Sequence, residues 1–322
     1  MADFALLVPA GAFHSSVGAC LDAFTLVRGQ VERLFPPEEA IKMETRLRLL
    51  SNDGAPVALV DGRSLDADGA PDSRTHYDLV HLPSFRVGGG SEALRARLDR
   101  SGELLQWLRR QWQEGAVISA SGSSVFLLAA AGLIETESVP MPRALVPLCR
   151  QFYPRLLIDE RRGLIEHDRI VMGNGLAGDT ALMVRVIERT VSPAMGRWLA
   201  SVAGSDALAA DGLAGDTLVA NAQLWLEQRY AQDVRIADLA KLLSTSHATR
   251  IRRFSQALDM GPKEYVQHLR VQSARTMLRR TNRSIEQIAA LVGYRDVRSF
   301  RTIFRAQTGM TASAYRASAR KS

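Results

Sequence analysis

Apolar positions in the first part of the chain alternate between short runs typical of buried strands and longer stretches with helical spacing. The run from Asp3 to Pro9 is apolar and of strand length, whereas Leu104, Leu108 and Trp112 recur at helical spacing. Strands that alternate with helices in this way predict a flavodoxin-like α/β fold, with a mostly parallel sheet covered by helices on both faces. The predicted strands are residues 3–9, 45–51, 78–82, 116–120, 156–159 and 169–172, and the predicted helices are residues 17–28, 103–113, 125–131 and 177–189.

The composition changes after this part of the chain. Residues 203–215 read AGSDALAADGLAG, a Gly-rich stretch with few bulky side chains, which favours an interdomain linker. Because 322 residues exceed the usual size of one domain, we expect two. The predicted division is a first domain over residues 1–200, a linker over 201–217 and an all-α second domain over 218–322.

An internal repeat runs through the second domain. Apolar residues recur at an offset of 49, which becomes 50 after a one-residue difference in a turn. Each copy has an apolar helix, a short turn and a second, Arg-rich helix, which is the layout of a helix-turn-helix unit. A helix over Lys263 to Arg280 lies between the copies and is expected to set their spacing. The recurring pairs are Ile236 and Ile285, Leu239 and Ile288, Ala240 and Ala289, Leu243 and Val292, Phe254 and Phe304, Met260 and Met310, and Tyr265 and Tyr315.

The second helix of each copy has an apolar face and a face of hydrogen-bond donors. In the later copy Phe300 and Phe304 fall toward a core, while the donors fall on the other side. Arg can grip guanine in a fork or neutralise phosphate, and one helix fits a major groove about 12 Å wide. A single such row is commonly a solvated face, but here it recurs inside a duplication. The rows are Arg298, Arg301, Thr302 and Arg305 in the later copy and Thr249, Arg252, Arg253 and Gln256 in the earlier copy, with His247 and Ala248 at the start of the earlier helix.

The net charge of +7 is concentrated in the second domain. Residues 216–322 contain 19 Lys and Arg against 8 Asp and Glu, whereas residues 1–215 contain 22 against 26. A basic tail on a mildly acidic body indicates a polyanion partner, and the scarcity of aromatic or Leu-rich faces beside the Arg residues disfavours a membrane. Two cationic helices on one rigid unit would enter successive major grooves of double-stranded DNA, about 34 Å apart. An architectural DNA-binding protein without sequence preference is the alternative in the same class.

Three stretches of the second domain strongly resemble the AraC/XylS family of transcription regulators. They are IADLAKLL, RRFSQALDMGPKEYVQHLRVQSARTML and SIEQIAALVGYRDVRSFRTIFRAQTGMTASAYR, together nearly the whole of residues 232–316. The resemblance implies a sequence-specific DNA-binding transcription regulator, expected to be an activator that contacts RNA polymerase at a promoter.

The same resemblance places the base-reading helices at residues 246–257 and 297–307. One departure is that Arg250 stands where the family usually has an apolar core residue, with Ile251 one position later. The predicted DNA-binding residues are His247, Ala248, Thr249, Ile251, Arg252, Arg253, Val297, Arg298, Ser299, Arg301, Thr302 and Arg305.

Residues 3–190 more loosely resemble the PfpI-type, class I glutamine amidotransferase-like domain. The similar pieces are the first strand with GACLDAF, the turn entering SVFLLAAAGLI, and GNGLAGDTALMVRVIER. Active members carry a Cys on a strand-to-helix elbow, assisted by an upstream carboxylate and backbone N–H donors. In this chain the Cys position is Gly122, the acidic position is Ser16, and the glycine pair after the third strand is Ser84-Phe85. We therefore expect a catalytically degenerate domain and no enzyme.

A serine hydrolase with a DNA-binding tail, acting on amides or thioesters, is the alternative from another class. Ser121, Ser123 and Ser124 lie near the elbow, but a serine nucleophile needs a base within hydrogen-bond reach. The position where the family often carries a His is Pro142. The remaining candidates stand in no recognisable motif; they are His14, His76, His81 and His167.

The former active site leaves two outcomes open. It either holds a small-molecule effector, because clefts at the carboxyl ends of strands bind ligands, or it is filled and the domain only forms a homodimer. The predicted pocket residues are Ser16, Asp22, Ser84, Phe85, Gly122 and Ser123. We expect no cofactor and no metal, since Cys20 and Cys149 are too few and too far apart for a metal site or a disulfide framework.

The beginning of the chain predicts no targeting segment. MADFALLVPAG lacks the basic region of a signal peptide and is typical of a core strand. The longest apolar run, Val125 to Ile134, is about half of the ~20 residues that a membrane-spanning helix needs. The predicted location is the cytoplasm, in association with the nucleoid.

Overall fold

The computed structural model describes residues 2–35, 45–203, 217–235, 238, 247–281 and 283–319, with only the backbone described at residues 217, 218, 247–251, 280, 318 and 319. The chain divides into two compact units, Met1–Leu208 and Ala209–Ser322. Most of the predicted linker, residues 204–216, lies outside the described residues. None of the described helices is long and apolar enough to cross a membrane.

A six-stranded sheet with the order β2-β1-β5-β6-β10-β9 is the centre of the amino-terminal unit. Its pairings are parallel except that of β9 with β10. All residues of the central strand β5 are buried, and Val80 lies between Ala5 of β1 and Ile118 of β6. The strands are β1 (Ala2–Leu7), β2 (Thr45–Leu50), β5 (Leu79–Leu82), β6 (Val117–Ser121), β9 (Leu164–His167) and β10 (Ile170–Gly173).

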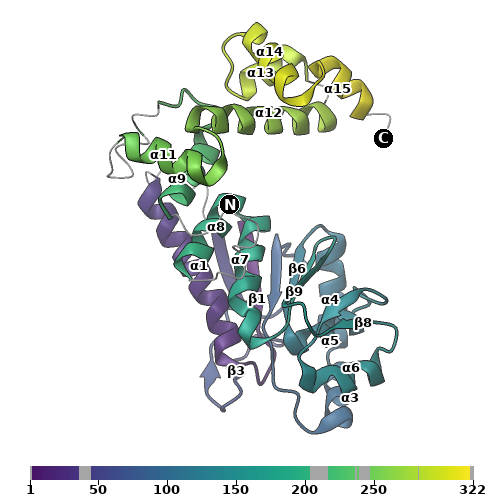
Figure 1. Ribbon diagram of the computed structural model, residues 1–322. Coiled ribbons are helices and arrows are strands. Elements are labelled where there is room, and N and C mark those ends of the chain that lie inside the picture. The colour runs from purple at the N-terminus through teal and green to yellow at the C-terminus, as the bar shows by residue number, and fades with distance from the viewer. Residues whose placement is uncertain are drawn as a thin grey trace. The chain divides into compact units, whose positions relative to one another are not determined.

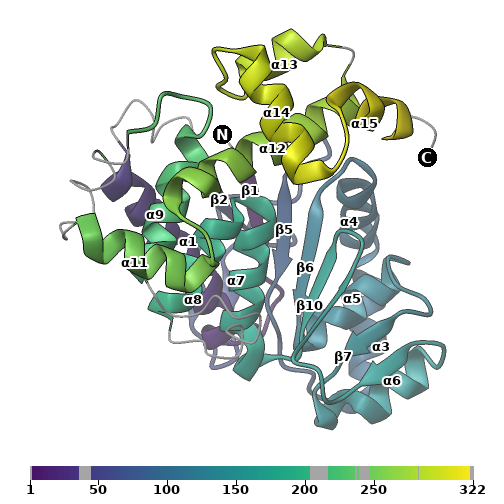
Figure 2. The same ribbon diagram turned by 45° about the horizontal axis from the view of Figure 1, so that its top comes forward.

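Helices cover both faces of this sheet (Figures 1 and 2). Helices α1, α7 and α8 pack together on one face, and α4 and α5 pack together on the other. Most of their buried side chains are apolar, with Trp107 and Leu108 as examples on α4. The helices are α1 (His14–Leu34), α3 (Gly90–Arg100), α4 (Gly102–Gln113), α5 (Val125–Ala130), α6 (Val146–Phe152), α7 (Asp179–Thr190) and α8 (Pro193–Val202).

The predicted fold class is confirmed, and one predicted strand of the main sheet is misplaced. Residues 156–159 do contain a strand, β8 (Leu157–Asp159), but it pairs with β7 (Ser138–Pro140) in a separate parallel ribbon. The reason is that β6 and β9 occupy both hydrogen-bonding edges of β10. Two short strands, β3 (Val57–Ala58) and β4 (Ser64–Leu65), form a further ribbon that was not predicted.

The carboxyl-terminal unit has two hydrophobic cores that share one helix. Tyr265 and Val266, near the start of α12, pack in the first core with Phe254. Ala274 and other residues of the later turns of α12 pack in the second core with Phe304. The helices are α9 (Thr217–Arg229), α11 (His247–Leu258), α12 (Pro262–Arg280), α13 (Ile285–Leu291), α14 (Val297–Thr308) and α15 (Ala312–Ala319).

The predicted duplication is visible in the packing of the two copies. Phe254 and Tyr265 meet edge to face with ring centroids 5.5 Å apart, and Phe304 and Tyr315 do so at 5.7 Å. Asp259, just after α11, has a left-handed φ of 51°, and Gly309, fifty positions later, has a φ of 75°. The two copies therefore pack the same aromatic pair edge to face and end the corresponding helix with a left-handed residue.

Gly293 forms the turn between α13 and α14 at a point of close backbone contact. Its φ is +92°, and a Cβ atom there would lie 2.5 Å from the carbonyl oxygen of Ala231, in the segment after α9. Arg270 of α12 holds the same segment, because its Nε donates to the Tyr230 carbonyl at 2.7 Å and a terminal nitrogen donates to the Gln232 carbonyl at 2.9 Å. The turn between α13 and α14 thus packs directly against the backbone that follows α9, a helix of the first core.

We expect Gly293→Ala to lower the free energy of unfolding of the carboxyl-terminal unit by about 2 kcal/mol or more, because left-handed strain and a backbone clash add. Gly261→Ala is the control, since Gly261 has a φ of −79° and no atom within 4 Å of its added Cβ. We expect it to cost less than about 1 kcal/mol, mainly as a weaker helix cap. Urea unfolding followed by circular dichroism measures both, and equal costs would contradict the seating of the turn.

Candidate functional site

Helix α14 is fixed at both ends by its own sequence. The carboxylate of Asp296 accepts hydrogen bonds from the backbone N–H groups of Arg298 at 3.0 Å and Ser299 at 2.9 Å. These bonds, led by that from Ser299, lower the pKa of Asp296, so the cap is charged at neutral pH. Gly309 ends the helix in the left-handed conformation.

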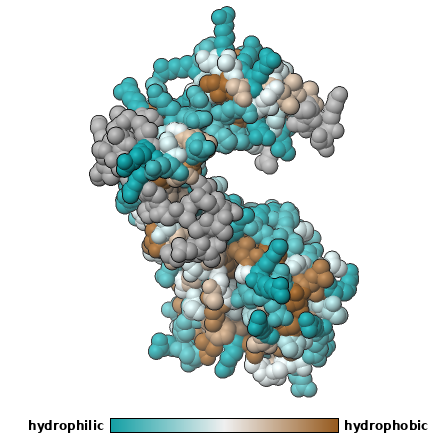
Figure 3. All heavy atoms as spheres, viewed as in Figure 1, coloured by the Kyte–Doolittle hydropathy of each residue, from teal (hydrophilic) through white to brown (hydrophobic). Residues whose placement is uncertain are grey.

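The two faces of α14 differ as the sequence predicts. Phe300 and Phe304 are fully buried in the second core. Arg298, Arg301, Thr302 and Arg305 are exposed on the other side. In Figure 3 most of the coloured surface of the carboxyl-terminal unit is hydrophilic.

Some of the predicted contact residues already have partners within the unit. Arg301 forms an ion pair with Glu286 of α13 at 2.9 Å, and the Ser299 hydroxyl donates to Asp296 at 2.8 Å. Val297 is half-buried at the edge of the second core. Arg298 and Arg305 form no ion pair with any described residue, which leaves these two guanidinium groups available to a ligand.

Helix α11 repeats this arrangement as far as its side chains are described. Arg252, Arg253 and Gln256 are exposed, and Phe254 is buried. For residues 247–251, which include Arg250 and the remaining predicted contacts of this copy, only the backbone is described. Those predicted contacts are His247, Ala248, Thr249 and Ile251. The predicted helix that precedes α11 in the first copy lies outside the described residues, apart from Asp238.

The elbow of the amino-terminal unit keeps the backbone of a nucleophile turn without a nucleophile. Gly122 follows β6 with a φ of +48°. A Cβ atom on Gly122 would lie 2.7 Å from the Ser84 hydroxyl oxygen and 3.0 Å from the Cα of Gly175. The space that a catalytic side chain needs is therefore occupied.

Serine side chains close the elbow by hydrogen bonds to its surroundings. The Ser123 hydroxyl donates to the Phe85 carbonyl at 2.6 Å and accepts the Phe85 N–H at 2.8 Å. The Ser124 hydroxyl donates to the Pro83 carbonyl at 2.6 Å, and Ser16 accepts the Ser84 N–H at 2.8 Å. All four serines are buried, so none is placed to attack a substrate.

Asp179, at the start of α7, is a buried carboxyl group next to Ser121. The sequence did not predict it as a site residue. It accepts a hydrogen bond from Ser121, and one of its oxygens has no partner among the described residues. Burial raises the pKa of Asp179 by more than the nearby Ser121 and Ser16 hydroxyl groups lower it. Its position inside the GNGLAGDTALMVRVIER stretch was the available signal, although the sequence assigned it no role.

The four His residues of the amino-terminal unit have partners away from the elbow serines. His81 bonds to Ser119 at 3.0 Å, and burial lowers its pKa to about 3, which keeps it neutral. His14 and His76 lie beside surface carboxylates, and His167 bonds to the Ser138 carbonyl. None is placed to act as the base for a serine nucleophile.

The six predicted pocket residues do not share one environment. Ser16, Ser84, Gly122 and Ser123 lie together in the closed elbow, whereas Asp22 is exposed on α1. Phe85 is buried at the edge of the elbow and also lines a groove of about 490 Å³ beside it.

The described part of the carboxyl-terminal unit holds one complete helix-turn-helix pair, α13 and α14, and a second Arg-bearing helix, α11, in two cores that share α12. Together with the α/β unit and its closed elbow, this defines a two-domain protein with a helix-turn-helix unit. Residues 239–318 match the family described as "Helix-turn-helix domain". The chain is 26% identical over 283 residues to the HTH-type transcriptional regulator CdhR of Pseudomonas aeruginosa, covering 84% of this chain and 82% of CdhR. It is 36% identical over 81 residues to the HTH-type transcriptional activator RhaS of Enterobacter sp. strain 638, covering 25% of this chain and 29% of RhaS.

A solved structure shows the same fold for the amino-terminal unit. A protein from Vibrio parahaemolyticus superposes with a TM-score of 0.51 and 16% sequence identity, covering 61% of this chain and 95% of that one. The chain is thus a DNA-binding transcription regulator, with a helix-turn-helix domain over residues 239–318 and similarity to CdhR along most of its length. Its amino-terminal unit shares the fold of the Vibrio protein.

We expect Gly122→Cys to leave the protein without hydrolase activity and to lower its free energy of unfolding by about 2 kcal/mol or more, because the new side chain meets Ser84 in a left-handed backbone. Adding Ser84→Gly should recover about 1 kcal/mol of this loss beyond additivity. Gly18→Cys, on α1 with open space around it, is the control and should not destabilise. A Gly122→Cys protein as stable as the wild type would contradict the filled elbow.

We expect Asp179→Asn to become more stabilising relative to wild type as the pH rises from 4 to 7. A carboxyl group whose folded pKa lies above its unfolded value favours the folded state at low pH, and that contribution is lost as the pH rises through the folded pKa. Urea unfolding at both pH values measures the difference between variant and wild type. A difference that stays constant or falls with pH would show that Asp179 is ionised without cost.

Proposed function

We propose that one chain reads double-stranded promoter DNA with α11 and α14, each in a major groove. The support is that both helices turn a buried Phe to their own core and keep Arg side chains exposed. The proposed contacts are the predicted set: His247, Ala248, Thr249, Ile251, Arg252, Arg253, Val297, Arg298, Ser299, Arg301, Thr302 and Arg305.

The contacts of α14 are proposed to divide into two kinds. Arg298, near the amino end of the helix, would read a base edge, because recognition helices commonly meet base edges with their first residues. Arg305, two turns later, would neutralise a phosphate. Arg301 can bind DNA only by exchanging its partner Glu286 for an acceptor on the duplex, so it is proposed to contribute less to affinity.

Helix α12 supports a spacing suited to successive grooves. Its 19 residues rise about 28 Å at 1.5 Å per residue, close to the roughly 34 Å of one duplex turn. Because the first turns of α12 pack in one core and its later turns pack in the other, this helix would fix the spacing of the two recognition helices.

The amino-terminal unit is proposed to act without catalysis. The observation behind this is the elbow, where Gly122 has no side chain and the neighbouring serines are buried and hydrogen-bonded. We propose that this domain, residues 1–200 before a linker over 201–217 and a DNA-binding domain over 218–322, forms a homodimer and responds to a small effector. An effector changes DNA binding only if it binds two arrangements of the protein with different affinity.

Activation is the proposed sign of regulation, with RNA polymerase as partner and the cytoplasmic nucleoid as location. RhaS, which resembles the DNA-binding part of this chain, is named an activator. The hydrolase alternative is not favoured, because no elbow serine has both an exposed hydroxyl and a His beside it among the described residues.

We expect Arg298→Ala to reduce the preference for the cognate site by about 1–3 kcal/mol and Arg305→Ala to weaken binding to all duplexes and reduce its salt dependence. Gel shifts on the gene's own upstream region and on a random duplex, at two salt concentrations, measure both effects. Arg63→Ala is the control, because it removes an exposed charge from the amino-terminal unit. Equal affinity of the wild type for both duplexes would indicate an architectural protein, and unchanged binding by both variants would contradict the assigned face.

A further inference from the structure

A groove at the carboxyl ends of β1 and β5 is lined by three Arg side chains and by no carboxylate. It has a volume of about 490 Å³, within the roughly 300–1,000 Å³ typical of small-molecule sites. Arg86 comes from the segment after β5, and Arg97 and Arg100 come from the last turn of α3. The lining set lies wholly within the described residues and contains neither Asp nor Glu.

The Arg97 side chain lies along this groove, with its guanidinium group over the Phe85 ring. Its guanidinium carbon lies 4.4 Å from the centroid of the Phe85 ring, and a Cβ atom on Gly11 would come within 4.0 Å of a terminal nitrogen. The side chain therefore reaches over Phe85 toward the loop after β1.

The charge on Arg97 lacks a paired carboxylate among the described residues of the unit. Arg97 is half-buried and forms no ion pair with any described residue. Burial, and then the nearby Arg100, lower its pKa, which means that both factors disfavour the charged form. An anion between the two guanidinium groups would remove this penalty, because partly buried charges are stabilised by pairing.

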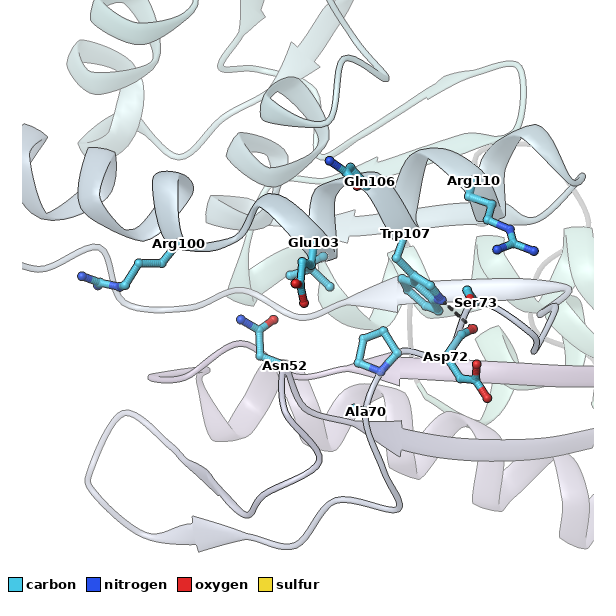
Figure 4. A pocket seen from close by; sticks show the side chains of 11 residues that line it. Asn52, Ala70, Asp72, Ser73, Arg100, Glu103, Gln106, Trp107 and Arg110 are labelled. Carbon is cyan, nitrogen blue, oxygen red and sulfur yellow. Dashed lines mark hydrogen bonds between the residues drawn. The ribbon is translucent and has the colours of Figure 1, made fainter.

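A neighbouring hollow also contains Arg side chains, but carboxylates balance their charge. It has a volume of about 600 Å³ and includes Arg100 and Arg110, but Asp72 and Glu103 also line it. In Figure 4 Glu103 lies on the helix between Arg100 and Arg110, and the Trp107 indole donates to the Asp72 carbonyl at 3.1 Å. The formal charges of that hollow cancel, whereas those of the groove around Arg97 do not.

We propose that the groove beside Phe85 binds a small organic anion, a carboxylate or phosphate monoester with an apolar body. Arg97 would grip the anionic group in a fork, with Arg86 and Arg100 adding charge at the rim. Ala58, Val87 and Ala93, which also line the groove and are at least partly exposed, offer apolar surface to the body of the ligand. This site rests on the proposed effector role of the unit, but it places the ligand beside the closed elbow and not inside it.

The test uses the full-length chain and two probes, benzoate and phenyl phosphate, with benzamide as the uncharged counterpart of benzoate. Titration at low ionic strength, followed by ligand-observed NMR, should show saturable binding of both anions at least tenfold tighter than that of benzamide. Arg97→Gln should weaken anion binding at least tenfold, and Arg97→Lys should weaken it less. Arg95→Gln is the matched control, because Arg95 is exposed on the same helix and stacks on Phe152 outside the groove.

Two results would overturn the site: neither anion binding tenfold better than benzamide, or Arg95→Gln weakening the anions as much as Arg97→Gln. Circular dichroism of each variant verifies folding, and Arg97→Lys provides the readout if Arg97→Gln fails to fold. A gel shift in the absence of anion separates this test from the proposed function, because Arg97→Gln should bind promoter DNA as the wild type does. Anion binding without any change in DNA affinity would support the groove and contradict only its regulatory use.

Discussion

Helix α12 contributes side chains to both hydrophobic cores of the carboxyl-terminal unit. Because its first turns pack with Phe254 and its later turns pack with Phe304, neither recognition helix can shift far without disturbing one of the cores. Arg270, in the middle of α12, adds hydrogen bonds to the backbone carbonyls of Tyr230 and Gln232. The backbone contact between Gly293 and Ala231 closes the same junction. The separation of the two Arg-bearing faces is therefore a property of packed and hydrogen-bonded contacts, and a flexible linker would not maintain it.

The amino-terminal unit has a strand-to-helix elbow whose central position is closed by neighbouring groups. The left-handed turn at Gly122 is retained, yet the Ser84 hydroxyl fills the position where a nucleophile would project. The serines around it bond to the carbonyls of Phe85 and Pro83, so the polar groups of the elbow are satisfied by one another. The proposed anion site lies beside this elbow, at the carboxyl ends of β1 and β5, where Arg97 has no ion-pair partner among the described residues. The sheet and its helices supply rigidity to such a site whether or not a reaction takes place there.

Local pattern predicted most of the regular structure. The spacing of Phe300 and Phe304 was enough to place the buried face of α14, and the offset of about fifty residues was enough to expect two similar units. The predicted place of β8 in the main sheet was wrong, because strand pairing depends on which strand edges are free. That β9 pairs with β10 could not be predicted from the local sequence pattern. The roles of Asp179 and Arg97 were missed for a related reason. Their partners, Ser121 and Phe85, lie far away in the chain, and only the fold brings them together.

The central claim is that a single chain presents two helices to successive major grooves. Hydroxyl-radical footprinting combined with methylation interference, on the promoter fragment bound by the full-length protein, tests it most directly. For each bound chain we expect two protected patches on one face of the duplex, about ten base pairs apart, with guanine methylation interfering in both major grooves. A single protected groove per chain, or two patches on opposite faces of the duplex, would contradict the account.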